Sequence, residues 1–148
     1  MKTLINNILE TRAGFDTLAL RIGAGVIFTA HGAQKLFGWF GGYGLEGTAG
    51  WMESIGLAPG ILMAALAGGA EFFGGLLLIL GLLTRPAALI LAATMVVAIV
   101  SVHIGNGLFM SNNGYEFGLA LLVISIGLAF RGAGSLSADR ILHTKLAN

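Results

Sequence analysis

The sequence has no cysteine and few charged residues, and both shortages narrow the class of protein. Without cysteine there are no disulfides, no thiolate nucleophile, no dithiol relay and no cysteine-ligated metal cluster. Charged residues make up 10% of the 148 positions, whereas 56% are hydrophobic and 24 positions are glycine. A soluble domain of this size needs more polar side chains to cover its surface. The composition therefore indicates an integral membrane protein, with residues 1–148 forming a single membrane domain.

Four apolar segments approach the length of about 20 residues that a helix needs to cross a bilayer. They lie at about residues 17–36, 60–83, 86–104 and 115–130. We therefore expect an all-α fold, a four-helix bundle surrounded by the lipid bilayer. The last segment is short for a crossing, so we expect it to tilt or to thin the bilayer locally.

Three segments outside these spans carry local patterns of their own. Residues 1–14 have apolar side chains at helical spacing and predict an amphipathic helix at the interface. A cleaved signal peptide is less favoured, because charged residues precede the apolar run and no small-x-small site clearly follows it. The glycine- and aromatic-rich residues 37–59 predict an interfacial loop that contains a short helix. Thr84 is the expected N-cap of the third span, and Ser135 or Ser137 is expected to cap a final amphipathic turn.

The basic residues predict the orientation of the chain in the membrane. Their formal excess is only +1 and they are scattered, so we expect no nucleic-acid partner. With four crossings, Lys35 is the one basic residue on the outer side, and Arg21 lies just inside the other face. The basic residues on that other side are Lys2, Arg12, Arg85, Arg131, Arg140 and Lys145. Because basic residues concentrate in cytoplasmic loops, both termini are predicted to lie in the cytoplasm.

Glu71 is the one carboxylate in the otherwise apolar segment 67–83, AGGAEFFGGLLLILGLL. A carboxyl group near the bilayer centre costs roughly 2.5 kcal/mol or more, so an intramembrane acid indicates a functional site. Arg21, which lies inside the first span, is its expected partner in a buried polar network. The alternative is a purely structural pair that fixes the register of the helices.

A second group of polar residues converges at the outer end of the predicted bundle. His31, His103 and Glu116 come from three different spans, and we expect them to act as the catalytic groups that transfer protons or contact a ligand. The expected ligand-binding residues beside them are Lys35, Gln34 and Trp39. A quinone-like ring or a small anion suits histidine and acid groups among apolar and aromatic side chains. A haem or a metal ion is less favoured, because the histidines lack recognisable ligand spacing.

Together with the His103 region, four motifs resemble, in their order, those of the DoxX family of small four-helix bacterial membrane proteins. They are RIGAGVIFTAHGAQKLFGWFGG (21–42), LAGGAEFFGGLLLILGLLTRPAA (66–88), NGYEFGLALL (113–122) and GAGSLSADRIL (132–142). The family pattern maps onto Arg21, His31, Gly32, Lys35, Glu71, Arg85, His103, Glu116 and Asp139. The tail departs from the usual Ser-Leu-Asp, because Ser137 and Ala138 put Asp139 two residues later.

The resemblance implies a multi-pass protein of the bacterial inner membrane. Some relatives resemble the membrane subunit of thiosulfate:quinone oxidoreductase, and others are linked to membrane redox and oxidative-stress complexes. We therefore expect a redox-associated subunit that binds a quinone or a small sulfur-containing solute, with quinone as its one suggested cofactor. A protein partner or a homo-oligomer is also expected, and any enzymatic activity would be that of a thiosulfate:quinone-type oxidoreductase subunit. The alternatives are a non-catalytic scaffold or assembly subunit and a small permease, the latter less favoured because no inverted repeat is present.

Overall fold

The structure is a computed structural model that describes residues 7–11 and 13–147, and the regular structure in these ranges is helical throughout. The elements are α2 (Leu18–Phe37), η1 (Trp39–Gly41), α3 (Gly44–Ser54), α4 (Gly60–Leu80), α5 (Thr84–Ala98), the π-helical turn η2 (Ile99–His103), η3 (Ile104–Asn106), η4 (Met110–Asn112), α6 (Glu116–Arg131) and α7 (Ala138–Ala147). The expected all-helical class is thus confirmed, and α3 is a short helix within the expected loop. Part of the predicted N-terminal helix, with Lys2 and Arg12, lies outside the described residues.

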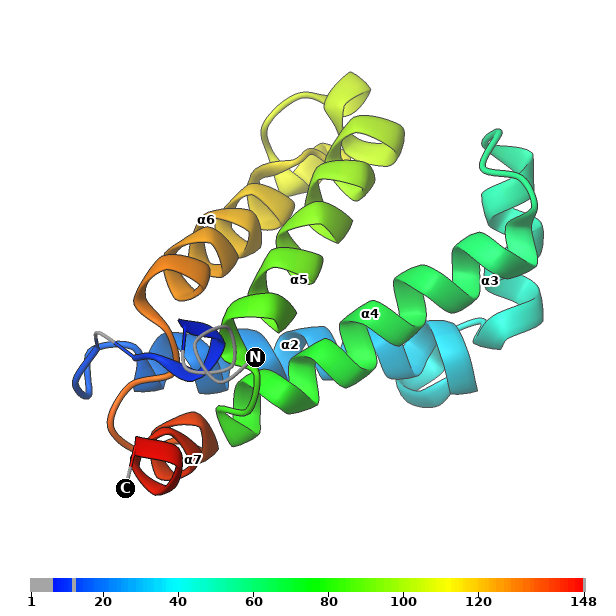
Figure 1. The fold of residues 1–148 in the computed structure, drawn as a ribbon. Helices are drawn as coiled ribbons and strands as arrows, with labels where there is room; N and C mark the ends of the chain where they lie inside the picture. Colours follow the sequence, from blue (N-terminus) through cyan, green and yellow to red (C-terminus); the bar gives the residue numbers. More distant parts are fainter. Residues whose placement is uncertain (1–6, 12, 148) are drawn as a thin grey trace.

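α2 and α4 pack against each other in antiparallel directions and run together across the view in Figure 1. Glycine allows their close approach, because a Cβ placed on Gly25 would lie only 2.8 Å from the Gly75 main-chain oxygen. Gly32 and Gly68 are buried in the same interface. Small residues of this kind let membrane helices approach until their main chains are almost in contact. The glycines therefore fix which residues of α2 and α4 lie opposite one another.

α5 and α6 form a second antiparallel hairpin, which rises away from α2 and α4 in Figure 1. The two hairpins meet through an apolar core toward the end of the molecule where the termini lie. Its buried residues are Ala24, Phe28, Leu78, Ala87, Ala88, Leu91, Met95, Leu121 and Leu128. Away from this core, the hairpins diverge toward α3 on one side and the η2–η4 connection on the other. The four long helices thus pack as two hairpins that touch at one end, and the expected four-helix bundle is not confirmed.

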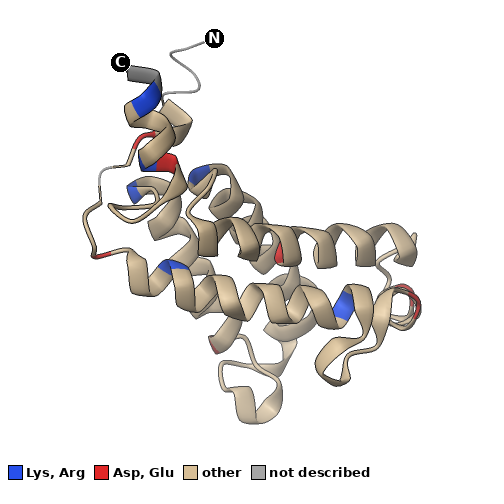
Figure 2. Ribbon diagram, turned by 90° about the horizontal axis from the view of Figure 1, so that it is seen from below, with Lys and Arg blue, Asp and Glu red and all other residues tan. Residues whose placement is uncertain are grey.

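Charged residues are sparse along the helices, and several Lys and Arg residues lie toward the chain termini in Figure 2. Arg131 ends α6 and Arg140 lies in α7. Lys35, by contrast, lies in the last turn of α2, at the end of that helix away from the chain termini. Among the ten residues of α7, the exposed Ile141 and Leu142 adjoin Arg140. The charges in the spans themselves are few, as expected of helices surrounded by lipid.

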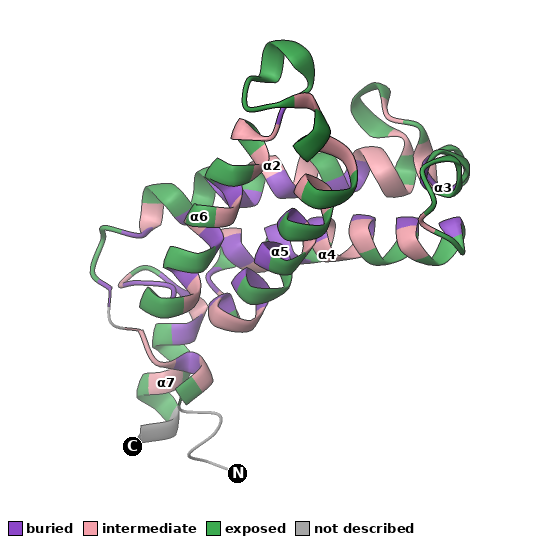
Figure 3. Ribbon diagram, turned by 90° about the horizontal axis from the view of Figure 1, so that it is seen from above, coloured by how far each residue is buried: buried purple, intermediate pink, exposed green. Residues whose placement is uncertain are grey.

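Large apolar side chains are exposed on the outward faces of the helices, which are green in Figure 3. They include Leu20, Val26, Ile61, Leu66, Phe73, Leu80, Leu89, Ile90, Val123 and Phe130. Soluble monomers rarely expose continuous apolar surfaces of this extent. Two helical stretches, Gly60–Leu80 and Thr84–Asn106, are long and apolar enough to cross a membrane. The outward faces therefore suit contact with lipid, and the number of four crossings stays a prediction.

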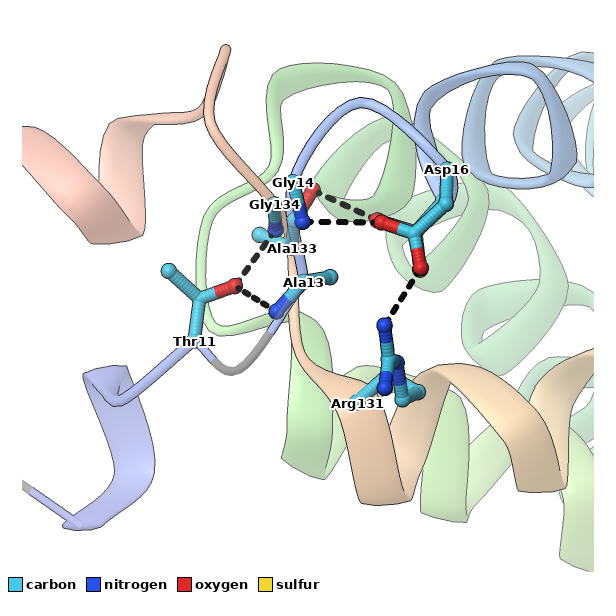
Figure 4. Close-up of polar contacts among 8 residues, drawn as sticks. Thr11, Ala13, Gly14, Asp16, Arg131, Ala133 and Gly134 are labelled. Carbon is cyan, nitrogen blue, oxygen red and sulfur yellow. Dashed lines mark hydrogen bonds and ion pairs between the residues drawn. The ribbon is translucent and has the colours of Figure 1, made fainter.

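The N-terminal segment is tied to the connection between α6 and α7 by the polar contacts in Figure 4. The Thr11 hydroxyl oxygen accepts hydrogen bonds from the main-chain N–H groups of Gly134, at 2.7 Å, and of Ala13, at 3.4 Å. Arg131 pairs with Asp16. The guanidinium hydrogen bond lowers the pKa of this exposed carboxyl group below its ordinary value of 3.8. These contacts hold residues before α2 against the end of α6.

Helix α5 is capped by a side chain from the distant tail. Thr84 is the first residue of α5 and not its N-cap, so that expectation was wrong. The Asp139 carboxylate instead accepts hydrogen bonds from the main-chain N–H groups of Leu83, at 2.7 Å, and Thr84, at 2.9 Å. Ser137 caps α7, because its hydroxyl oxygen accepts from the Arg140 main-chain N–H at 3.2 Å. The Asp139 carboxylate thereby holds α7 against the turn between α4 and α5.

Candidate functional site

The two hairpins enclose a cleft of about 550 Å³ between their halves that lie away from the chain termini. Its wall is mostly apolar and includes Phe28, Met52, Met95, Phe117 and Leu121. Besides Tyr43, four titratable side chains line it, and they are His31, Lys35, Glu71 and His103. This volume lies in the range of 300–1,000 Å³ that is typical of small-molecule sites, as is an apolar wall with a few polar groups.

Lys35 and Glu71 form the ion pair of this cleft. Lys35 Nζ lies 2.6 Å from Glu71 Oε2, and the Glu71 side chain is only 5% exposed. The expectation that Arg21 pairs with Glu71 was therefore wrong, because Lys35 is the partner. The physical reason is the register of the helices. Because Gly68 of α4 packs beside Lys35, one further turn of α4 brings Glu71 within reach of the Lys35 ammonium group.

Arg21 lies at the other end of the α2–α4 pair, beside Gly81 and outside the cleft. It is buried, and its Nη2 donates a 2.6 Å hydrogen bond to the Leu136 main-chain oxygen. The Asp139 main-chain N–H donates to the Gly81 oxygen at 2.9 Å, so Arg21 and Asp139 both join the tail to the end of α4. The sequence did not predict that the tail docks against the end of α4. Its one signal was that Arg21 and Asp139 both fit the family pattern.

The two histidines approach the cleft from different helices. His31 lies one turn before Lys35 on α2, and its ring centroid is 6.0 Å from that of Phe117 on α6. His103 ends the π-helical turn η2, and its Nδ1 lies 2.9 Å from the Asn113 main-chain oxygen. The structure thus brings His31, Lys35 and His103 to one cavity, together with Glu71.

The remaining candidate residues lie outside this cleft. Glu116 begins α6, and its Oε1 accepts a 2.6 Å hydrogen bond from the Met110 main-chain N–H. Gln34 lines a second cavity of about 460 Å³ under α3, which Lys35 also lines. Trp39 lies outside both cavities and packs on Phe37, with ring centroids 5.1 Å apart. Glu116 therefore orders the loop that precedes α6. The two cavities have three lining residues in common, which are Lys35, Tyr43 and Trp51.

The polar groups of the cleft can bind an organic ligand through hydrogen bonds. In the described ranges, no three His, Asp or Glu side chains are close enough together to hold a metal ion. The Lys35 ammonium group has three N–H donors, of which one is directed at Glu71. The imidazoles of His31 and His103 can each donate or accept a proton. A ring with polar oxygens therefore finds both an apolar wall and hydrogen-bonding partners here.

The family model described as DoxX matches residues 17–104. The chain belongs to the DoxX family. The matched range includes α2 to α5 and η2, and with them every titratable residue of the cleft. Glu116 and Asp139 lie beyond it.

Two relatives of this DoxX-family chain are named as membrane proteins. The inner membrane protein YqjF of Escherichia coli is 33% identical over 134 residues, which is 86% of this chain and 92% of that protein. The uncharacterized membrane protein Rv3486 of Mycobacterium tuberculosis is 33% identical over 93% of this chain and 88% of its own length. The putative oxidoreductase CatD of Bacillus subtilis is 38% identical over 83% of this chain and 84% of its length. No solved structure matches the chain. The DoxX chain is thus a membrane protein.

Proposed function

We propose that this DoxX-family protein crosses the bacterial inner membrane four times, through α2, α4, α5 with η2, and α6, with both termini in the cytoplasm. The apolar outward faces of these helices support the crossings. The basic residues Arg85, Arg131, Arg140 and Lys145 belong to the segments next to the termini, as the positive-inside rule requires of a cytoplasmic face. The cleft then opens within the outer half of the membrane.

The cleft binds a quinone ring, and the protein serves as a redox-associated membrane subunit. The observation that carries this proposal is the juxtaposition of His31, His103 and the Lys35–Glu71 pair on the otherwise apolar wall of one cavity. A quinone needs this combination, because its ring is apolar whereas its two oxygens exchange hydrogen bonds and protons. The oxidoreductase name of the Bacillus relative supports a redox role.

Each polar residue has a separate task in this proposal. Lys35 donates a hydrogen bond to one ring oxygen through an N–H that is not directed at Glu71. Glu71 holds the ammonium group in position and balances its charge in the membrane. His31 and His103 accept and release the protons of the ring oxygens. Phe117, which contacts His31, provides an aromatic wall for the ring.

Two other functions give different results in the same experiments. A small sulfur-containing anion would reach Lys35 through the second cavity under α3, and its chemistry would take place on bound substrate or on a partner protein, since the chain has no cysteine. In a non-catalytic scaffold, the polar residues would only stabilise the helices. Its partner would bind exposed aromatic residues such as Phe40 and Tyr43, which are 74% and 85% exposed.

Purification in a mild detergent, followed by mass spectrometry of the organic extract, tests the proposal directly. We expect a co-purified quinone, and an azido-quinone probe should label α2 and η2 in a reaction that decylubiquinone inhibits. His31→Ala should weaken this competition about tenfold, as expected for the loss of a hydrogen bond worth roughly 1.4 kcal/mol. Val123→Ala, on the outward face of α6, is the matched control and should change nothing.

Absence of both the quinone and the competed labelling in folded protein would contradict quinone binding and favour the scaffold. Thiosulfate-dependent reduction of decylubiquinone by the protein with its natural partners would add the sulfur-linked activity. Labelling without this reduction would leave a quinone subunit with another electron donor.

A further inference from the structure

The π-helical turn η2 gives His103 a special position in the cleft. α5 ends at Ala98, and the next five residues, Ile99–His103, continue as a π-helix. A single π-turn is rare in an α-helix and is frequent at functional sites, because the widened turn re-aims the side chains that follow it. His103 is the last residue of this turn and lines the cleft.

The hydrogen bond of His103 defines which ring nitrogen carries a proton. Nδ1 lies 2.9 Å from the main-chain oxygen of Asn113. A carbonyl oxygen can only accept, so Nδ1 is the donor, and in the neutral imidazole Nε2 is then an acceptor. Among the described residues, none forms a hydrogen bond with Nε2. His103 therefore offers the cleft a hydrogen-bond acceptor.

The Asn106 side chain also contacts the Asn113 carbonyl group, which determines the tautomer of His103. Its side-chain Nδ2 donates to the main-chain oxygens of Asn113, at 3.3 Å, and Val102, at 3.2 Å. The Asn113 oxygen thus accepts from both Asn106 and His103. The neighbouring Asn112 side chain contacts a different group, the Asn106 main-chain oxygen, at 2.9 Å.

We propose that the cleft selects the reduced, hydroxyl-bearing form of its ring ligand, because His103 Nε2 accepts a hydrogen bond from a ring hydroxyl, and that Asn106 is a positioning residue that fixes this tautomer. An oxidised quinone presents only carbonyl oxygens, and two acceptors cannot form a hydrogen bond. Across the cleft, Lys35 can donate to the other ring oxygen in either oxidation state, since a hydroxyl oxygen also accepts. The identity of the ligand rests on the proposed function, whereas the tautomer of His103 does not.

Long-range ¹H–¹⁵N NMR of the full-length, ¹⁵N-labelled protein in micelles reads the tautomer without any ligand. The chain has three histidines, so single His→Gln variants assign the signals. We expect the Nδ1–H form for His103 at a pH where its ring is neutral. Asn106→Ala should shift His103 toward the commoner Nε2–H form, whereas Asn112→Ala should leave it unchanged. An Nε2–H tautomer in the folded wild-type protein would overturn the proposal.

Binding of decylubiquinol and decylubiquinone under anaerobic conditions tests the selection. We expect the reduced form to bind about threefold to tenfold more tightly, the range that one hydrogen bond supplies. His103→Ala should remove this preference and Asn106→Ala should reduce it, with Asn112→Ala as control and thermal melting as the check on folding. Equal affinities in the wild-type protein would contradict the selection. If neither form binds, the proposed function itself fails, and the NMR result still decides the tautomer.

Discussion

Lys35 and Glu71 lie on different helices, 36 positions apart in the sequence, and their side chains meet at 2.6 Å between Nζ and Oε2. Lys35 comes from the last turn of α2 and Glu71 from the middle of α4, so the pair connects the two helices of one hairpin at the wall of the cleft. Its contribution to folding and its contribution to ligand binding can be separated by substitution.

Replacing Lys35 with Met should destabilise the protein by about 3 kcal/mol, because a buried carboxylate then lacks a counter-charge. Glu71→Gln should cost less, since the Lys35 side chain is 25% exposed and its ammonium group can reach water. Thermal unfolding in detergent measures both losses. The double variant should regain part of the stability lost in Lys35→Met. A double variant no more stable than Lys35→Met would contradict the pair.

Gly25→Ala should separate α2 from α4. The added Cβ would lie 2.8 Å from both the Gly75 main-chain oxygen and the Ile79 side chain, a main-chain clash that rotamer changes cannot relieve. Overpacking of this kind typically costs about 1–3 kcal/mol. Gly23→Ala in the same helix is the matched control, because nothing lies within 4 Å of the added carbon. Comparable melting temperatures for the two variants would refute the close packing.

Asp139→Ala should release α7 from the turn between α4 and α5. The substitution removes the acceptor for two main-chain N–H groups, those of Leu83 and Thr84, and lost caps cost about 0.5–2 kcal/mol. Limited proteolysis of α7 and thermal melting should both detect the change. Asp139→Asn retains one acceptor oxygen and should be intermediate. Asp16→Ala, at an exposed carboxylate, should leave the protease resistance of α7 unaltered.

The pairing of Asp16 with Arg131 predicts a pH dependence confined to acid. Because the folded protein lowers the pKa of Asp16, the pair stabilises the fold above the ordinary pKa of 3.8, and this stabilisation is lost as the pH falls through the lowered pKa. We expect it to be constant at neutral pH. An NMR titration of the Asp16 carboxyl carbon should show the lowered pKa, and Arg131→Gln should return it toward 3.8. An identical titration in both proteins would contradict the pair.

The sequence predicted the class of the protein better than the contacts of its polar residues. Composition and apolar length indicated a helical membrane protein, because both follow from the solvent that surrounds the chain. The partner of Glu71 depends on how α2 and α4 are aligned. That alignment follows from main-chain contacts such as that between Gly25 and Gly75, which helical periodicity does not reveal. Without this alignment, the sequence indicated Arg21 as the partner of Glu71, although Lys35 is the residue in contact with it.

Two other polar residues make contacts that the sequence did not predict, and the causes are local. Glu116 was expected at the ligand, but it lies in the first turn of α6, where the preceding loop offers its carboxylate the Met110 main-chain N–H. Thr84 was expected to cap α5, but Asp139, 55 positions later, accepts the hydrogen bond of the Thr84 N–H. The π-turn that ends at His103 has no periodicity signal of its own, since it consists of five residues at the end of an apolar helix.

The distance in sequence between Thr84 and Asp139 also has a consequence for biogenesis. The ribosome completes α5 and α6 before it adds the carboxylate that caps α5. During synthesis, the start of α5 therefore remains without this acceptor until the tail has emerged. We expect α7 to dock against the turn between α4 and α5 only after α5 and α6 have been made, as the last step in the assembly of the described fold.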